Sequence, residues 1–101
     1  MKPINLNAIV TEKQLQSQVY HLAKIGHWDY YHTHNSLYSP AGFPDCVLVR
    51  GDRLVFAELK RENGKTSVEQ DHWLQVLAFI PGVEVYLWRP QDFEDIVKIL
   101  K

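Results

Sequence analysis

The sequence predicts an α/β fold, in which a mixed β-sheet is flanked by helices in the order α-β-β-β-α-β-α. Two apolar runs, Cys46–Arg50 and Arg53–Ala57, surround Gly51-Asp52, a pair that favours a tight hairpin turn. Capping patterns at Thr11 and Ser67 precede apolar residues at helical spacing. A meander of strands followed by a crossover produces a mixed sheet with helices against it.

The first helix is expected to begin after Thr11, the N-cap residue, with Gln14 completing a capping box. Residues 1–10 form a short lead-in. Glu12 falls on the same stripe as the apolar residues, by the rotation of about 100° per residue. We therefore expect an acidic side chain on the inner face, where it either interacts favourably with the helix dipole or points into a site. Gly26 is expected to end the helix as its C′ residue. The stripe consists of Leu15, Val19 and Leu22.

The segment Trp28–Thr33 alternates in polarity and predicts the first strand. His32 and His34 are two residues apart, so their rings share a side. This spacing can serve zinc, but no cysteine or further histidine lies at a supporting spacing, and zinc is not expected. Either ring could instead face a phosphate. Residues 35–42 are loop-like in composition and lead into Asp45.

The remaining elements follow a polar turn at 61–65. A second helix starts after Ser67, with Gln70 in the capping-box position, and Pro81-Gly82 ends it. Its expected buried residues are Trp73, Leu74, Val76, Leu77 and Ile80. Alternation over 83–88 predicts the fourth strand, and Pro90 opens the last helix.

Composition places the chain in the class of small globular domains. Its 101 residues fit one domain, 1–101, with one core. The single cysteine, Cys46, lies in an apolar strand, which favours a reducing, cytoplasmic setting. No apolar run approaches the ~18 residues of a membrane span, and the N-terminus has no leader pattern. We therefore expect no membrane association.

The hairpin creates a charged patch where its first strand begins and its second ends. Antiparallel pairing brings Asp45 beside Glu58 and Lys60, which share one face. A surface salt bridge is the ordinary explanation of such a group. Glu58, however, continues the face of Leu54 and Phe56, and a half-buried carboxylate is unfavourable unless it is paired or holds a metal. Two converging carboxylates suit Mg²⁺ or Mn²⁺ rather than zinc.

The charge distribution allows two interpretations. The net charge of −1 is not that of a typical nucleic-acid-binding domain. Five cations nevertheless lie within sixteen residues and are expected near the patch, where they could bind phosphates. The alternative is a solvated hairpin tip, which charge alone favours. The five are Arg50, Arg53, Lys60, Arg61 and Lys65.

Pro44-Asp45 followed by Glu58-Leu59-Lys60 resembles the PD-(D/E)XK nuclease signature. The longer runs 39–45, 56–60 and 67–73 resemble the VRR-NUC branch of that superfamily in particular. The resemblance covers most of the chain, from about Glu12 to Arg89. A bare PD…ExK pattern is weak, and the glycine before Phe-Pro-Asp and the downstream Gln-x-x-Trp make it more specific.

The resemblance implies a restriction-endonuclease-like sheet and a Mg²⁺- or Mn²⁺-dependent endonuclease that hydrolyses DNA phosphodiesters. Asp45, Glu58, Lys60 and Gln70 would be its catalytic residues. The metal ligands would be Asp45, Glu58, the Leu59 carbonyl and Glu12. The alternative interpretation of Gln70 is that it acts only as a capping residue. DNA contacts are expected from His32, Asn35, Arg61 and Lys65.

Stand-alone proteins of the resembling group are small homodimers that act on branched DNA such as four-way junctions. Trp28, Tyr30 and Tyr31 are candidate interface residues, although core packing is the more ordinary use for them. The second hypothesis is a catalytically silent DNA-binding or assembly module of the same fold; the complete set of Asp45, Glu58 and Lys60 argues against it. A third is a metal-dependent enzyme acting on a small anionic substrate.

Overall fold

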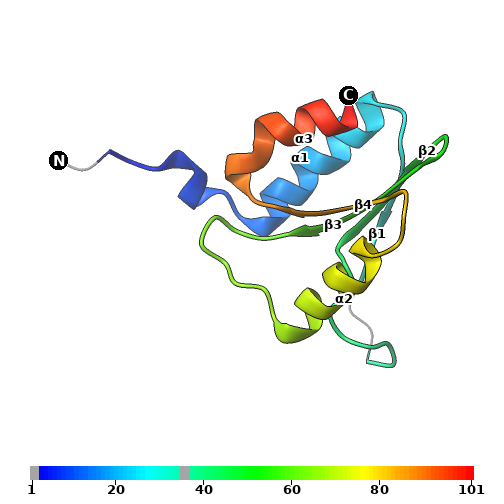
Figure 1. Ribbon diagram of the computed structural model, residues 1–101. Helices are drawn as coiled ribbons and strands as arrows, with labels where there is room; N and C mark the ends of the chain where they lie inside the picture. The colour runs from blue at the N-terminus through cyan, green and yellow to red at the C-terminus, as the bar shows by residue number, and fades with distance from the viewer. Residues whose placement is uncertain (1–2, 35–36) are drawn as a thin grey trace.

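The computed structural model describes residues 3–34 and 37–101, which form a four-stranded mixed sheet flanked by helices (Figure 1). This confirms the predicted α/β class and the order of its elements. The elements are η1 (Leu6–Ile9), α1 (Glu12–Ile25), β1 (Asp29–His32), β2 (Cys46–Arg50), β3 (Arg53–Leu59), α2 (Val68–Ala78), β4 (Val83–Trp88), η2 (Pro90–Asp92) and α3 (Phe93–Leu100).

The sheet has the strand order β1-β2-β3-β4, so β3 lies in its interior. The first three strands pair antiparallel, and β4 pairs parallel to β3 after the crossover through α2. Helices α1 and α3 lie side by side on one face, and α2 lies on the other (Figure 1). Both faces of β3 are therefore covered by helices.

The main core lies between the sheet and the α1–α3 pair. Val55, Ala57 and Leu59 of β3 are buried there, together with Leu15 and Ile96. The face towards α2 is less complete: Leu77 is the buried residue of that helix, while Val76 and Ile80 are exposed. The predicted apolar face of α2 was therefore wrong in part, because this short helix covers only a portion of its side of the sheet.

Both capping boxes are present as predicted. Thr11 and Gln14 exchange hydrogen bonds at the start of α1, and Ser67 and Gln70 do the same at α2. Gly26 ends α1 as predicted, but as its C-cap residue with φ −83° rather than as the C′ residue, which is His27 with a positive φ of 60°. Glycine is required at 26 for space, since a Cβ there would collide with the Leu100 carbonyl oxygen.

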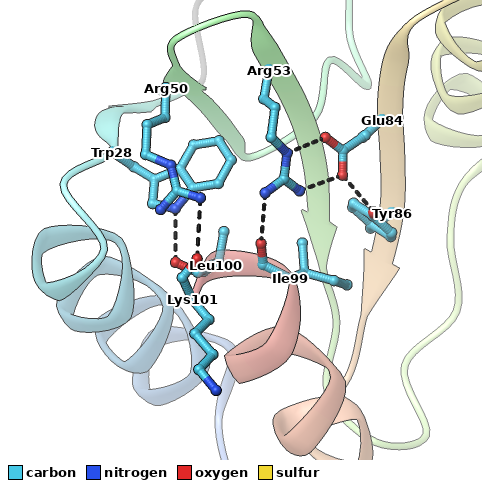
Figure 2. Close-up of polar contacts among 8 residues, drawn as sticks. All are labelled: Trp28, Arg50, Arg53, Glu84, Tyr86, Ile99, Leu100 and Lys101. Carbon is cyan, nitrogen blue, oxygen red and sulfur yellow. Dashed lines mark hydrogen bonds and ion pairs between the residues drawn. The ribbon is translucent and has the colours of Figure 1, made fainter.

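Two arginines and one tryptophan fasten the ends of α1 and α3 to the sheet (Figure 2). Arg50 donates to the carbonyl oxygens of Gly26 at 2.7 Å and Lys101 at 3.1 Å. Trp28 Nε1 donates to the Leu100 carbonyl at 2.9 Å. Both guanidiniums lie over the Trp28 ring, at 4.4 and 4.8 Å from its centroid. Cations at helix C-termini are stabilising.

Arg53 completes this group. It forms a two-bond ion pair with Glu84, at 2.8 and 2.7 Å, and donates to the Ile99 carbonyl at 3.1 Å. Arg50 and Arg53 adjoin the hairpin turn, at the opposite end of the strands from Asp45 and Glu58. The expected five-cation cluster was therefore wrong, because neighbours in sequence along a hairpin diverge by about 3.3 Å per residue in space.

Within residues 3–34 and 37–101, none of the helices has the length and apolar character needed to cross a membrane.

Candidate active site

Strand register places Asp45 beside Glu58. Cys46 pairs with Ala57 in the β2–β3 ladder, so the next pair outward is Asp45 with Glu58. Their side chains lie close enough for the Asp45 carboxyl to raise the pKa of Glu58. Pro44, which is buried, fixes the approach to the strand. The hairpin prediction of converging carboxylates is thus matched by the geometry.

Glu58 is more deeply buried than the sequence suggested, with 1% of its surface exposed. Its Oε1 accepts a hydrogen bond from Gln70 Nε2 at 3.0 Å. Its Oε2 is buried and has no partner in the described part of the chain. Burial first, and then contact with the Asp45 carboxyl, raise the pKa of Glu58 to about 8. The site therefore holds a carboxyl group whose charge is poorly compensated by the chain.

Asp45 is held by backbone contacts from both neighbouring strands. Its Oδ2 accepts the Leu59 N–H at 2.8 Å, and its carbonyl oxygen accepts the Thr33 N–H at 2.8 Å. His32 Nδ1 donates to the same carbonyl at 3.1 Å. His32 thus lies behind the Asp45 backbone. These contacts fix the orientation of the Asp45 carboxyl towards Glu58.

Gly42 sets the position of the N-terminus of α2 and hence of Gln70. Its φ is +93°, a left-handed conformation that only glycine adopts readily. A Cβ at this position would lie 2.5 Å from the carbonyl carbon of Glu69 and 2.7 Å from the amide nitrogen of Gln70. The loop can approach α2 closely only because no side chain intervenes, and Gln70 then reaches Glu58.

Gln70 forms the expected capping box and also reaches the Glu58 carboxyl, while its catalytic role stays a prediction. Its Oε1 accepts the Ser67 N–H at 2.9 Å within the capping box, while Nε2 reaches Glu58. The amide orientation is therefore defined at both ends. The capping hydrogen bond and the hydrogen bond to Glu58 are compatible, because each uses a different atom of the Gln70 amide.

Lys60 and Glu12 act on the pair through their charges. The positive charge of half-buried Lys60 lowers the pKa of Glu58, and the negative charge of Glu12 raises it, although burial outweighs both. Glu12 is exposed at the start of α1, so the sequence prediction of a side chain on the inner face is wrong as to burial, although its charge still acts on Glu58.

The donor set suits a divalent cation at two carboxylates. Glu58 Oε2 is a buried oxygen without a partner, and the adjacent Asp45 carboxyl repels it when both are ionised. A cation would bind the unpartnered Oε2 and would remove the repulsion between the two carboxylates. Within the described residues no group of three or more His, Cys, Asp or Glu side chains is positioned to hold a metal. Glu12 and the Leu59 carbonyl as further ligands therefore stay predictions.

The predicted DNA-contacting residues are placed unevenly. Arg61 and Lys65 are exposed on the loop between Lys60 and α2. His32 is half-buried, and Asn35 lies outside the described residues. The loop itself is held by Arg89, whose Nη1 donates to the carbonyl oxygens of Arg61 at 2.7 Å, Glu62 at 3.3 Å and Gly64 at 2.6 Å.

Sequence reasoning missed two residues near the site. Arg89, which holds the loop after Lys60, was noted only as the end of the family resemblance. Thr33 lies directly across the ladder from Asp45, and its Oγ1 is buried with no partner among the described residues. The pairing of Thr33 with Asp45 depends on the register between β1 and β2, which the long connection between these strands does not fix, so no sequence signal could have placed it.

No model of a known protein family matches this chain, and no curated protein matches it. The likeness to VRR-NUC nucleases therefore rests on the motif residues themselves.

Proposed function

We propose that this chain is a Mg²⁺- or Mn²⁺-dependent endodeoxyribonuclease of the VRR-NUC type, with a restriction-endonuclease-like fold. The observation that carries the proposal is Glu58, a buried carboxyl with an unpartnered oxygen, in contact with Asp45. A buried carboxylate pair of this kind is unfavourable for folding. A cation bound by the two carboxylates in the functional protein would offset their repulsion and explain why the pair is present. Lys60 and Gln70 beside it complete the pattern.

Asp45 and Glu58 would hold the metal, which when bound polarises the scissile phosphate and lowers the pKa of a water molecule. Gln70 orients the Glu58 carboxyl through its 3.0 Å hydrogen bond. The Leu59 N–H keeps Asp45 turned towards Glu58. Lys60, close enough to lower the pKa of Glu58, would neutralise charge that develops on the phosphate in the transition state.

The preferred substrate on this proposal is branched DNA such as a four-way junction, cut by a homodimer in the cytoplasm. The domain offers little surface for reading bases in a groove, so recognition by DNA shape is favoured over recognition by sequence. Two active sites related by a two-fold axis would face two strands. Of the three aromatic interface candidates, Trp28 is buried and Tyr30 half-buried, so Tyr31 alone is largely exposed.

A cleavage assay tests this function. Labelled four-way junction, flap and linear duplex DNA are incubated with Mg²⁺ or Mn²⁺ and wild-type protein, Asp45→Asn or Lys60→Ala. Asp52→Asn, which alters an exposed carboxylate at the hairpin turn, is the matched control. We expect metal-dependent cleavage by the wild type and the control, and loss of at least 100-fold in the two site variants.

The other outcomes each point to a different class of protein. Intact DNA that shifts in a gel would replace the nuclease with the silent binding module. DNA that is neither cut nor bound, with metal still bound to the protein, would favour an enzyme for a small anionic substrate. Equal cleavage by wild type and Asp45→Asn would show that the site lies elsewhere.

A further inference from the structure

A groove of about 800 Å³ lies beside the carboxylate pair, on the α2 side of the sheet. Tyr31, Thr33 and His34 line it from β1 and the residues after it, the 39–43 loop lines a second side, and Trp73 of α2 closes a third. Its volume is in the range of small-molecule sites. The nuclease proposal assigns no role to this groove.

The groove is continuous with the site through the strand ladder. Thr33 is paired with Asp45, which is paired with Glu58, so the three side chains form one row across β1, β2 and β3. Thr33 belongs both to that row and to the groove wall. A ligand in the groove therefore lies next to whatever group occupies the carboxylate pair.

The lining selects for a flat, uncharged and partly polar ligand. Among the described residues that line the groove, none is Asp, Glu, Lys or Arg, so a phosphate there would meet His34 as its single ionisable basic partner. Tyr31 is 62% exposed and offers a free ring face. Trp73 is held rigid: its Nε1 donates to the Ala41 carbonyl at 3.2 Å, and Phe43 packs edge-on against it. Aromatic rings of this kind stack on nucleobases.

Thr33 supplies the second, independent observation. Its Oγ1 is buried and has no hydrogen-bond partner among residues 3–34 and 37–101, which is uncommon for a hydroxyl in a folded protein. Every nucleobase carries donors and acceptors on its edges, and those edges are free only when the base is unpaired. Thr33 forms part of the groove wall, so rotation of its side chain to another staggered rotamer would present the hydroxyl to the edge of a base in the groove.

We propose that this groove receives one unpaired nucleobase of the DNA strand whose phosphate lies at Asp45 and Glu58. The inference rests on the proposed nuclease function and adds the physical basis of its selectivity. A base within an intact duplex is stacked and paired, so it enters only after unstacking, whereas a base at a junction, flap or bulge is already free. Preference for branched DNA then follows from this groove rather than from base sequence.

The test measures binding in the Asp45→Asn background without added metal, so that no cleavage occurs. Three labelled duplexes of equal length are compared by fluorescence anisotropy: one fully paired, one with a single unpaired nucleotide, and one with an abasic residue at that unpaired position. The abasic DNA keeps the flexible backbone and lacks only the base. We expect the unpaired base to bind about tenfold more tightly than the abasic site, as for one stacked base.

Variants then locate the effect. Tyr31→Ala should abolish the preference for base over abasic site, and Tyr31→Phe should retain it. Thr33→Val should weaken the preference severalfold while leaving thermal stability unchanged or higher, because it removes an unpartnered hydroxyl. Phe79→Ala is the matched control, since Phe79 is an aromatic residue 86% exposed at the end of α2 and lies outside the groove.

Failure of the groove and failure of the nuclease give different results. If the wild type cleaves DNA with metal, yet base and abasic DNA bind equally, the nuclease stands and the groove proposal falls. Equal loss of preference in Tyr31→Ala and Phe79→Ala would also overturn it. If the wild type cleaves neither the four-way junction, nor the flap, nor the linear duplex, the nuclease proposal is wrong and the groove proposal is wrong with it.

Discussion

The carboxyl group of Glu58 lies where a charge is unfavourable, and its neighbours only partly compensate for it. Gln70 donates one hydrogen bond, and Lys60 contributes an opposite charge. Against these act burial, the contact with Asp45 and the charge of Glu12. Function at this site is therefore expected to oppose stability, as is common where a strained group serves binding.

Replacing Glu58 by Gln should stabilise the metal-free protein at high pH. The pKa of Glu58 rises from 4.5 to about 8 on folding, so the folded state holds the proton more tightly. Its contribution to stability is present below pH 4.5 and is lost as the pH rises towards 8. Urea unfolding in EDTA should show Glu58→Gln equal to wild type near pH 4.5 and about 1–3 kcal/mol more stable at pH 9.

Saturating Mg²⁺ should reduce the difference in unfolding free energy between Glu58→Gln and wild type at pH 9. The cation stabilises the wild type alone, because its binding needs both carboxylates. A pH-independent difference between the two proteins would contradict the assignment of the buried charge to Glu58.

Gln70→Ala and Gln14→Ala separate the capping role from the site role. Both residues close a capping box, and each accepts the N-cap amide at 2.9 Å. Gln14→Ala should lower the free energy of unfolding by about 1 kcal/mol and leave cleavage unchanged. Gln70→Ala removes the same bond and also the donor to Glu58, so DNA cleavage should fall at least tenfold. Equal cleavage by the two variants would make Gln70 a capping residue only.

At the scale of elements, the loop before β2 and the N-terminus of α2 form one unit through Gly42. Gly42→Ala combines positive-φ strain with a collision against the backbone of α2. Gly82→Ala has nearly the same strain, at φ 82° against 93°, but open space around its Cβ. It is therefore the matched control.

We expect Gly82→Ala to lower stability by about 1–2 kcal/mol. Gly42→Ala should lower it by a further 1–3 kcal/mol, approximately, through overpacking. It should also reduce cleavage, since Gln70 moves with α2, whereas Gly82→Ala leaves cleavage intact. Similar stability and activity in the two variants, measured by thermal unfolding and the junction assay, would show that α2 shifts without consequence.

At the scale of the whole molecule, the cations divide between two ends of the sheet. Arg50 and Arg53 hold the helix ends (Figure 2), while Lys60, Arg61 and Lys65 follow the other end of β3, the end at which Glu58 lies. A chain with net charge −1 can in this way still present a small basic surface. The electrostatic part of DNA binding should then come from the second group alone.

The salt dependence of binding measures this division. Each phosphate contact contributes about −0.9 to the slope of log K against log salt concentration. Lys65→Gln should reduce the slope by about that amount, and Arg50→Gln should leave it unchanged. Anisotropy titrations at salt concentrations from about 50 to 200 mM measure this slope. Circular dichroism confirms that Arg50→Gln is folded. An equal reduction of the slope in Lys65→Gln and Arg50→Gln would place Arg50 among the residues that contact DNA phosphates.

The elements and the carboxylate pair were predictable because their determinants are local. Thr11 with Gln14 and Ser67 with Gln70 each define a helix start within four residues. Gly51-Asp52 defines the hairpin, and the hairpin fixes which residue faces which. Asp45 therefore meets Glu58 by counting along two strands, without knowledge of the rest of the fold.

Contacts between distant segments could not be read in this way. Trp28 bonds to Leu100 across 72 positions, and only that packing explains why residue 26 is glycine. The hydrogen bonds of Arg50 to the Lys101 carbonyl and of Arg53 to the Ile99 carbonyl also join residues 51 and 46 positions apart in the sequence. The depth of Glu58 likewise depends on α2 returning over β3.

The sequence by itself determined the α/β class, the order of the elements, the two capping boxes and the approach of Asp45 to Glu58, since local hydrogen bonding and strand alternation set all of them. Only the tertiary structure decided the burial of Glu58, the missing partners of its Oε2 and of Thr33 Oγ1, and the groove between β1 and α2. Burial and hydrogen-bond satisfaction depend on which segments pack together across the whole chain, and no short window of sequence contains that information.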